Sequence, residues 1–249
     1  MRIVNWNIER HGPSTWQAKS LLAEIAELGP DVVCLTEAWE ASAEALGGYA
    51  ISAAGAAWSP QHDSERKVLL WSKHPWEDAG TIHQLEATGS AITGLTLFGE
   101  TQVRVAGLCV PYHFASPYGQ EPKAKPWSQH ERFLEDLSPL LRQWRDEGPV
   151  MVLGDFNQFM PRVWGPKRSH QLMEEAFAGY SIVTSGEIEG VAARAIDHVA
   201  FAGNLHATKV FGRPAAQGDG RKRSDHFGVM VDCRTAPSGH SQMPKLGLD

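Results

Sequence analysis

The chain has 249 residues, of which 42% are hydrophobic and 21% are charged, and this balance excludes a disordered chain and fits one large or two small globular domains. Lys and Arg number 23 against 29 Asp and Glu, so the formal net charge of -6 excludes a bulk basic field that attracts nucleic acid or anionic lipid. Any polyanionic substrate must therefore be bound by local contacts.

The cysteines and the hydropathy pattern indicate the compartment. Cys34, Cys109 and Cys233 each lie in an apolar, strand-like run, and their odd number without CxxC spacing argues against a disulfide framework or a zinc site. We expect buried, reduced thiols. Neither a signal-peptide-like apolar region nor an apolar run of about 20 residues is found, so we expect no membrane segment and interpret the protein as a cytoplasmic monomer.

The first 37 residues predict a β-α-β unit. A short strand is followed by a helix whose start is marked by the capping-box spacing of Ser14 and Gln17. A second apolar run then leads to Glu37. Because a right-handed crossover makes the two strands parallel, Asn7 and Glu37 are expected at the same edge of one sheet. The expected elements are strand 2–6, a helix from 13 to 28 and strand 31–36.

The middle of the chain predicts strands without long helices, divided by Gly, Pro and polar clusters as in an antiparallel meander. Ser128 and Glu131 then repeat the capping-box spacing, and apolar residues at helical intervals continue as far as Trp144. The expected strands are 49–53, 67–71, 91–98 and 102–110.

Val150 to Leu153 are apolar without alternation, which is typical of a strand buried on both faces, and Gly154 has the backbone freedom to end it. Asp155 and Asn157 follow, and in an extended backbone their side chains point the same way. The remaining pattern predicts two sheets packed face to face with helices outside, in a domain of residues 1–234. The other expected elements are helix 165–177, strands 181–184, 196–201 and 227–233, and a loose tail 235–249.

Polar side chains cluster at the ends of these predicted strands. Each cluster alone has an ordinary explanation, because Asp and Asn are common in turns and polar side chains can simply be solvated. Their joint occurrence is more informative, since one rim of a sheet pair can collect all of them. The clusters are Asn7, Glu37, Tyr112-His113, Asp155 with Asn157, and Asp197-His198 with Asp225-His226.

Six short motifs occur in a fixed order and resemble those of the endonuclease/exonuclease/phosphatase superfamily, which has the deoxyribonuclease-I-like fold. The resemblance covers Asn5 to Val231. It implies an α/β fold, namely a four-layered α-β-β-α sandwich of two packed mixed sheets with outer helices, and hydrolysis of phosphoester bonds with Mg²⁺ or Mn²⁺. The motifs are Trp6-Asn7, Leu35-Thr36-Glu37, Val110-Pro111-Tyr112-His113, Gly154-Asp155-Phe156-Asn157, Ile196-Asp197-His198-Val199 and Ser224-Asp225-His226-Phe227-Gly228-Val229.

The resemblance also implies how the metal and the base are held. Glu37 corresponds to the direct metal carboxylate, with Asn7 and Asp225 close to the ion, and such oxygen ligands suit a hard cation. His226 corresponds to the general base that takes a proton from the attacking water. Asp197 would accept the hydrogen of the other ring nitrogen, which fixes the tautomer and stabilises the imidazolium.

Three further catalytic roles follow from the same resemblance. Asp155 and Asn157 correspond to residues that orient the nucleophile and the phosphate. His113 falls where many relatives have a histidine that stabilises the transition state or assists the leaving group, and Tyr112 is the alternative that other relatives use.

The substrate is the least determined feature. Arg221 and Arg223 flank Lys222 in the densest positive cluster, which is either a solvated loop or a clamp for substrate phosphates. Trp39, Trp127 and Trp164 are expected in loops after motif strands, where they either pack or stack on a base, lipid or sugar face.

Three functions remain open. The first is a metal-dependent phosphodiesterase or nuclease; the sequence after Glu37 and after Asn157 does not favour a repair nuclease of the abasic-site type. The second is a phosphatase or phosphodiesterase of small or lipid phosphoesters. The third is a non-catalytic phosphate-binding module on the same fold. The presence of both His226 and its orienting carboxylate Asp197 argues against this third function, because a binding module needs no base.

Overall fold

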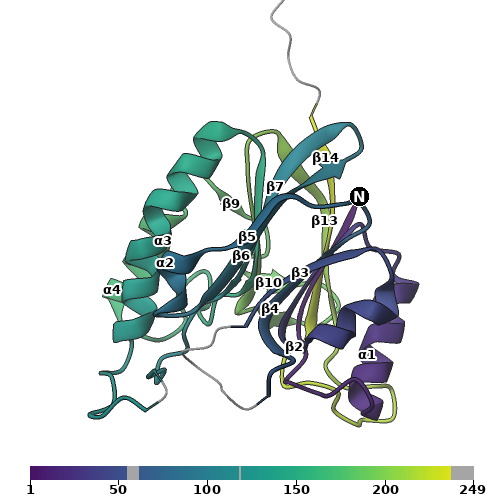
Figure 1. The fold of residues 1–249 in the computed structure, drawn as a ribbon, viewed down its shortest axis with the longest axis horizontal. Coiled ribbons are helices and arrows are strands. Elements are labelled where there is room, and N and C mark those ends of the chain that lie inside the picture. The colour runs from purple at the N-terminus through teal and green to yellow at the C-terminus, as the bar shows by residue number, and fades with distance from the viewer. Residues whose placement is uncertain (55–61, 118, 237–249) are drawn as a thin grey trace, which may run out of the picture.

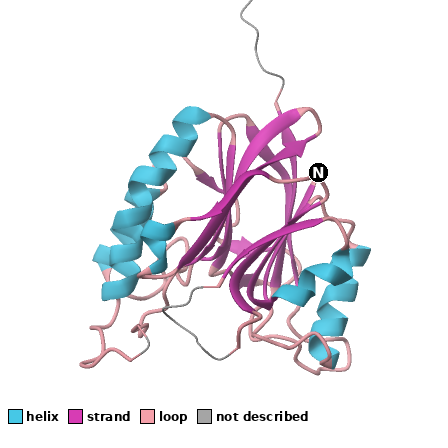
Figure 2. Ribbon diagram, viewed as in Figure 1, coloured by secondary structure: helices cyan, strands magenta, loops and turns pink. Residues whose placement is uncertain are grey.

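The computed structural model describes residues 1–54, 62–117 and 119–236. Two mixed sheets of six strands each pack face to face, and helices cover their outer faces (Figures 1 and 2). The predicted α/β architecture of two packed mixed sheets with outer helices is therefore confirmed.

The first sheet holds the N-terminal β-α-β unit and the C-terminal strand. The second sheet holds the central strands (Figure 1). The first comprises β1 (Arg2–Asn7), β2 (Val32–Trp39), β3 (Tyr49–Ala53), β4 (Glu65–Ser72), β13 (Leu205–Arg213) and β14 (Gly228–Thr235). The second comprises β5 (Glu77–Thr81), β6 (Ser90–Phe98), β7 (Thr101–Cys109), β8 (Val150–Asp155), β9 (Ser181–Ile182) and β12 (Asp197–Ala202).

The helices lie outside these sheets, and a small two-stranded sheet is separate from both. The helices are α1 (Trp16–Glu27), the 3₁₀ helix η1 (Glu40–Leu46), α2 (His83–Glu86), α3 (Ser128–Glu147) and α4 (Lys167–Ala176), and the small sheet pairs β10 (Glu187–Ile188) with β11 (Ala193–Arg194). Among the described residues no helix is long and apolar enough to cross a membrane.

Each large sheet has the order expected of a β-α-β unit extended by antiparallel strands. The orders are β13-β14-β1-β2-β4-β3 and β5-β6-β7-β8-β12-β9. Among the described strands, only β1 with β2 and β7 with β8 are parallel. In the first pair Asn7 is level with Thr36, and in the second Cys109 is level with Asp155. The prediction that the first two strands are parallel is confirmed.

The core has three layers of apolar packing. Alternate residues of the strands fill the space between the sheets, and the opposite faces pack against helices. Leu21 and Ile25 of α1 pack on the first sheet, and Phe133 and Leu137 of α3 pack on the second. All three cysteines are buried free thiols in strands, as predicted.

The two capping boxes place the first cap residue of each helix one position away from where the structure has it. Thr15 caps α1, and its Oγ1 accepts a hydrogen bond from the backbone N–H of Ala18 at 3.3 Å. Ser128 is already inside α3, and its hydroxyl donates to the carbonyl of Lys125 at 2.7 Å. A Ser or Thr at the right spacing therefore located the helices but not their first residues.

The predicted meander is divided between the sheets. β3 and β4 join the first sheet, whereas β6 and β7 join the second, and β5, which the sequence analysis missed, pairs with β6. β13 was missed as well. Both are edge strands that pair on one side and have few buried residues, so their sequences lack the apolar runs of central strands.

The C-terminal boundary stays a prediction. β14 extends to Thr235, one residue past the predicted end of the domain, and residues 237–249 of the predicted tail lie outside the described residues.

Gly154 has a different role from the predicted one. It lies inside β8 rather than after it, with a φ of +142°. A Cβ on Gly154 would collide with the carbonyl group of Leu108 on the neighbouring strand β7. Glycine is therefore required here by the close approach of two backbones.

Replacing Gly154 by Ala is expected to cost more than about 3 kcal/mol, because it combines backbone strain with a clash that only a shift of β7 can relieve. Urea unfolding monitored by circular dichroism measures the loss. Gly80→Ala in β5 is the control, since a Cβ there has no atom within 4 Å. Equal stability of the two variants would contradict this account of Gly154.

Candidate active site

Side chains from the two sheets meet at one rim. The amide of Asn7, at the end of β1, donates to Asp155 Oδ2 at 3.2 Å, and the backbone N–H of Asn157 donates to Asp155 Oδ1 at 2.9 Å. Asn157 has a φ of +51°, which turns the chain sharply after Asp155. Both carboxylate oxygens of Asp155 are thus engaged, and the residue is held between the sheets.

Asn5 makes a second tie between the sheets. Its amide donates to the carbonyls of Gly154, at 3.0 Å, and His198, at 3.2 Å, and the side chain is fully buried. The sequence analysis did not assign Asn5 a role. The available signal was a polar residue inside an otherwise apolar central strand, since such residues need buried partners.

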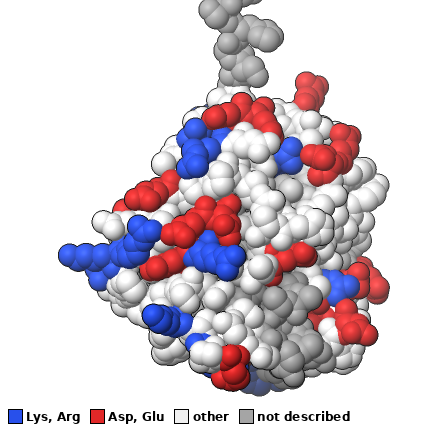
Figure 3. All heavy atoms as spheres, turned by 60° about the vertical axis from the view of Figure 1, so that its left-hand side comes forward, with Lys and Arg blue, Asp and Glu red and all other residues white. Residues whose placement is uncertain are grey.

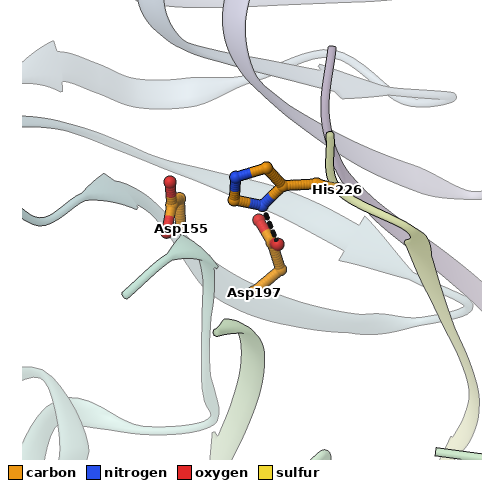
Figure 4. Close-up of side chains that lie close together, drawn as sticks. All are labelled: Asp155, Asp197 and His226. Carbon is orange, nitrogen blue, oxygen red and sulfur yellow. Dashed lines mark hydrogen bonds and ion pairs between the residues drawn. The ribbon is translucent and has the colours of Figure 1, made fainter. Parts of the chain in front are cut away.

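His226 and Asp197 form a hydrogen-bonded pair. Nδ1 of His226 lies 2.5 Å from Asp197 Oδ2 (Figure 4). The backbone N–H of His226 donates to Ser224 Oγ at 3.1 Å, and that hydroxyl donates to the carbonyl of Asn7 at 2.7 Å. The backbone of His226 is therefore fixed by Ser224, and its ring is oriented through Nδ1.

Asp155 lies beside this pair (Figure 4). One ligand atom from each of Asp155, Asp197 and His226 falls within 4.8 Å of the others. Burial, reinforced by the Asp197 carboxylate, raises the pKa of Asp155 to about 7. Burial alone would lower the pKa of His226. The surrounding carboxylates have the larger effect and raise this pKa to about 10. The negative charge of Asp155 and Asp197 therefore exceeds the positive charge that His226 supplies.

Glu37 is held by two cations. Its Oε1 lies 2.8 Å from Lys67 Nζ and 3.2 Å from a terminal nitrogen of Arg10. Burial alone would raise the pKa of Glu37, but these two partners lower it, so the side chain is a carboxylate at neutral pH. Glu37 has a φ of +50°, an uncommon conformation for a residue with a side chain.

The sequence analysis missed Lys67 and Arg10. Lys67 reaches Glu37 because β4 pairs with β2 in a register that places Thr36 opposite Val68. A pairing between strands about 30 residues apart has no local signature, so only the folded sheet reveals it.

Glu37 opens onto a pocket, here called the Glu37 pocket. Tyr112 and Asn157 line it as well, so it joins the rim of the first sheet to the loops of the second. It is lined by Arg10, Glu37, Lys67, Tyr112, Ser116 and Asn157, among others.

The donor chemistry of this rim suits a divalent cation. Glu37 and Asp225 both add to the effect of burial in raising the pKa of Asp197, so the carboxylates lie close enough to repel one another. Asp197 Oδ1 is buried and has no hydrogen-bond partner among the described residues. Hard oxygen donors with excess negative charge are what Mg²⁺ and Mn²⁺ prefer.

Asp225 is the most exposed of the predicted metal ligands, with 62% of its side chain accessible. Its Oδ1 lies 3.8 Å from His226 Nε2, and its backbone N–H donates to Glu9 Oε2 at 3.0 Å. It therefore borders His226 on the solvent side.

The predicted phosphate clamp lies elsewhere. Arg221 pairs with Asp219 at 2.8 Å and covers the ring of Trp16 in α1. Arg223 is buried and pairs with Glu24 of α1 at 2.5 Å. Neither lines the Glu37 pocket. A role of Arg221 and Arg223 in substrate binding stays a prediction.

The three tryptophans expected in loops divide into two groups. Trp39 is the last residue of β2, and its indole N–H donates to the carbonyl of Arg10 at 2.9 Å, so its predicted loop position is wrong. Trp127 and Trp164 do lie outside helices and strands, and both are close to His113. His113 borders a cleft next to the Glu37 pocket rather than the pocket itself.

The surface charge agrees with the net charge. Figure 3 shows acidic and basic side chains interspersed on the displayed face, without a continuous basic surface. A long polyanion therefore has no basic track to follow on this face.

Solved structures share this fold. They include D. rerio TDP2 complexed with single strand DNA product (14% identity, TM-score 0.69, covering 94% of this chain and 99% of that one). The human nocturnin catalytic domain with bound sulfate anion is also similar (18%, TM-score 0.68, 95% and 93%). A third is the endonuclease/exonuclease/phosphatase from Beutenbergia cavernae (19%, TM-score 0.62, 94% and 71%).

The sequence profile of the Endonuclease/Exonuclease/phosphatase family matches residues 4–226, and the chain belongs to this family. A search of curated proteins gives no match. The resemblance inferred from the six motifs is confirmed.

His226 is expected to remain protonated in the metal-free protein well above pH 6.5, its ordinary pKa, with a midpoint near pH 10. Asp197→Asn removes the main attractive charge and should lower that midpoint by at least about one unit. Histidine NMR titration measures both. Asp219→Asn, an exposed site bonded to Arg221, is the control.

The same shift predicts a pH effect on stability. Because the pKa of His226 is higher in the folded than in the unfolded protein, its protonation adds to the free energy of unfolding. This contribution is complete below about pH 6.5 and is lost as the pH rises towards 10. The urea midpoint of the wild type should therefore fall more steeply over this range than that of Asp197→Asn. Parallel curves would contradict the assigned pair.

Proposed function

We propose that the protein is a divalent-metal-dependent hydrolase of phosphoester bonds, acting as a phosphodiesterase or nuclease with His226 as general base. The observation that carries the proposal is the bond between His226 Nδ1 and Asp197 Oδ2, at 2.5 Å, within a rim of converging carboxylates. Membership of the endonuclease/exonuclease/phosphatase family supports it. A cytoplasmic location and a monomeric state belong to the same proposal.

The metal would be Mg²⁺ or Mn²⁺, held by Glu37, Asn7 and Asp225. When bound, it supplies Lewis-acid stabilisation of the charge that develops on the phosphate. Lys67 and Arg10 keep Glu37 ionised, which preserves it as a ligand. Asn7 is the last residue of β1, and its side chain is held in place by the hydrogen bond to Asp155.

The proton transfer is assigned to one atom. Because His226 Nδ1 is bonded to Asp197, its Nε2 is the nitrogen that takes a proton from the attacking water. Asp197 then stabilises the resulting imidazolium. Asp155 and Asn157 orient the water and a phosphate oxygen, and His113 or Tyr112 stabilises the transition state.

Two alternatives differ in substrate or in class. A phosphatase or phosphodiesterase of small or lipid phosphoesters would use the same rim. A non-catalytic phosphate-binding module would have no use for a base and an orienting carboxylate, and so the pair of Asp197 and His226 favours an enzyme. The single strand DNA product in one structural neighbour supports a nuclease over a lipid phosphoesterase.

EDTA is expected to abolish hydrolysis of bis-p-nitrophenyl phosphate, and added Mg²⁺ or Mn²⁺ should restore it, because the carboxylate-rich rim binds hard cations. Release of p-nitrophenolate measures the rate. A parallel panel of plasmid DNA, single-stranded DNA, RNA, inositol phosphates and sphingomyelin assigns the substrate class. Hydrolysis that is indifferent to the chelator would remove the metal from the mechanism.

His226→Ala should lower kcat by at least about a hundredfold, on the scale of general-base removal, and Asp197→Asn should be similarly damaging. The loss should grow with pH, since the wild-type base is increasingly deprotonated there. His83→Ala, a histidine with 85% of its side chain exposed, is the control. Near-normal rates in both active-site variants would move the base role, with His113 the next candidate.

A further inference from the structure

A cleft of aromatic side chains lies next to the Glu37 pocket. It is lined by Tyr112, His113, Trp127, Phe159 and Trp164, together with Asn157, and is called the aromatic cleft below. Tyr112 and Asn157 line both the Glu37 pocket and the aromatic cleft. A substrate whose phosphate enters the first therefore has its neighbouring group at the second.

We propose that the aromatic cleft is a subsite for a nucleobase attached to the phosphoester. The inference rests on the proposed function and goes beyond it, because it adds Trp127, Phe159 and Trp164, which have no catalytic role, and names the part of the substrate that they bind.

The rings of the cleft are arranged as walls rather than as a closed core. The ring centroids of Trp127 and Trp164 are 5.3 Å apart at an interplanar angle of 68°. His113 lies 5.1 Å from Trp164, edge to face, and 5.7 Å from Trp127. Trp164 is 47% exposed, so part of its ring surface is available to a further planar group.

The backbone holds Trp127 in place. Its φ is +69°, a left-handed conformation that is unfavourable for a residue with a side chain. Its N–H donates to the carbonyl of His113 at 2.7 Å. A Cβ on Gly165 would collide with the Trp127 indole, so the loop after Trp164 packs directly on that ring. The aromatic cleft is thus built before any ligand arrives.

The rim of this cleft is unusually apolar for a surface. Four of the seven exposed large hydrophobic residues in the described part of the chain belong to its two loops. Such clustering marks a binding site more often than scattered exposure does. They are Tyr112 (53% exposed), Phe114 (63%), Val163 (52%) and Trp164 (47%).

The charge distribution selects the ligand. The Glu37 pocket carries two cations, Lys67 and Arg10, against the one carboxylate of Glu37, whereas the residues that line the aromatic cleft include no Lys, Arg, Asp or Glu. A ligand that fits both has an anionic group next to an uncharged planar ring, which describes a nucleotide. In a duplex the bases are stacked on one another, so the base must come from a mononucleotide or a single strand.

The test compares AMP with ribose 5-phosphate, which has the same phosphate and sugar but no base. Isothermal titration calorimetry is done with Mg²⁺ in a His226→Ala background, so that turnover of either ligand is slowed at least about a hundredfold. AMP should bind roughly tenfold more tightly or better, the scale of one base stacked on an aromatic ring. Trp164→Ala should remove most of this preference, and Trp164→Phe should retain most of it.

Trp16→Ala is the matched control, because Trp16 is 38% exposed but lies on α1 against Arg221. Equal affinity for the two ligands, an unaffected Trp164→Ala variant, or the same loss in Trp16→Ala would overturn the subsite. Single-stranded oligo(dT) should compete with AMP, and a duplex that competes equally well would also overturn it. The binding readout is independent of turnover, so a failure of the proposed hydrolysis in the wild type is seen separately.

Discussion

The site depends on negative charges that the fold brings together. Apolar side chains fill most of the space between the two sheets, and the ends of β1, β8 and β12 meet at one rim. Asp155 and Asp197 are each only 3% exposed there. Buried carboxylates that face one another need a proton, a cation or a paired imidazole.

The ties that hold this rim are hydrogen bonds between sheets. Asn5 bonds the backbone of β8 and β12 from β1, and Asn7 bonds Asp155. Each uses an amide on one sheet to fix a group on the other, which resists sliding of the sheets in the way that apolar packing alone does not. The position of Asp155 relative to Asn7 is thus a property of the interface between the sheets.

A second rigid feature lies beside the first. The aromatic cleft is held by backbone geometry and by the close packing of Gly165 on Trp127, and it shares Tyr112 and Asn157 with the Glu37 pocket. The charged side chains line the Glu37 pocket, and the apolar aromatic side chains line the aromatic cleft. Together they form a site with two chemically distinct halves, which is how ligand pockets commonly combine affinity with orientation.

The sequence by itself determined the central strands, the long helices and the order of the motif residues, because apolar runs and turn residues are local signals. Asp197, His226, Glu37 and Asp155 were all identified in this way, and the structure brings them to one rim. Only the tertiary structure decided which strands join which sheet, that Lys67 faces Glu37, and that Arg223 is bound to α1. These depend on pairing between segments distant in the chain, where register and crossover geometry, rather than any local pattern, determine the neighbours of each side chain.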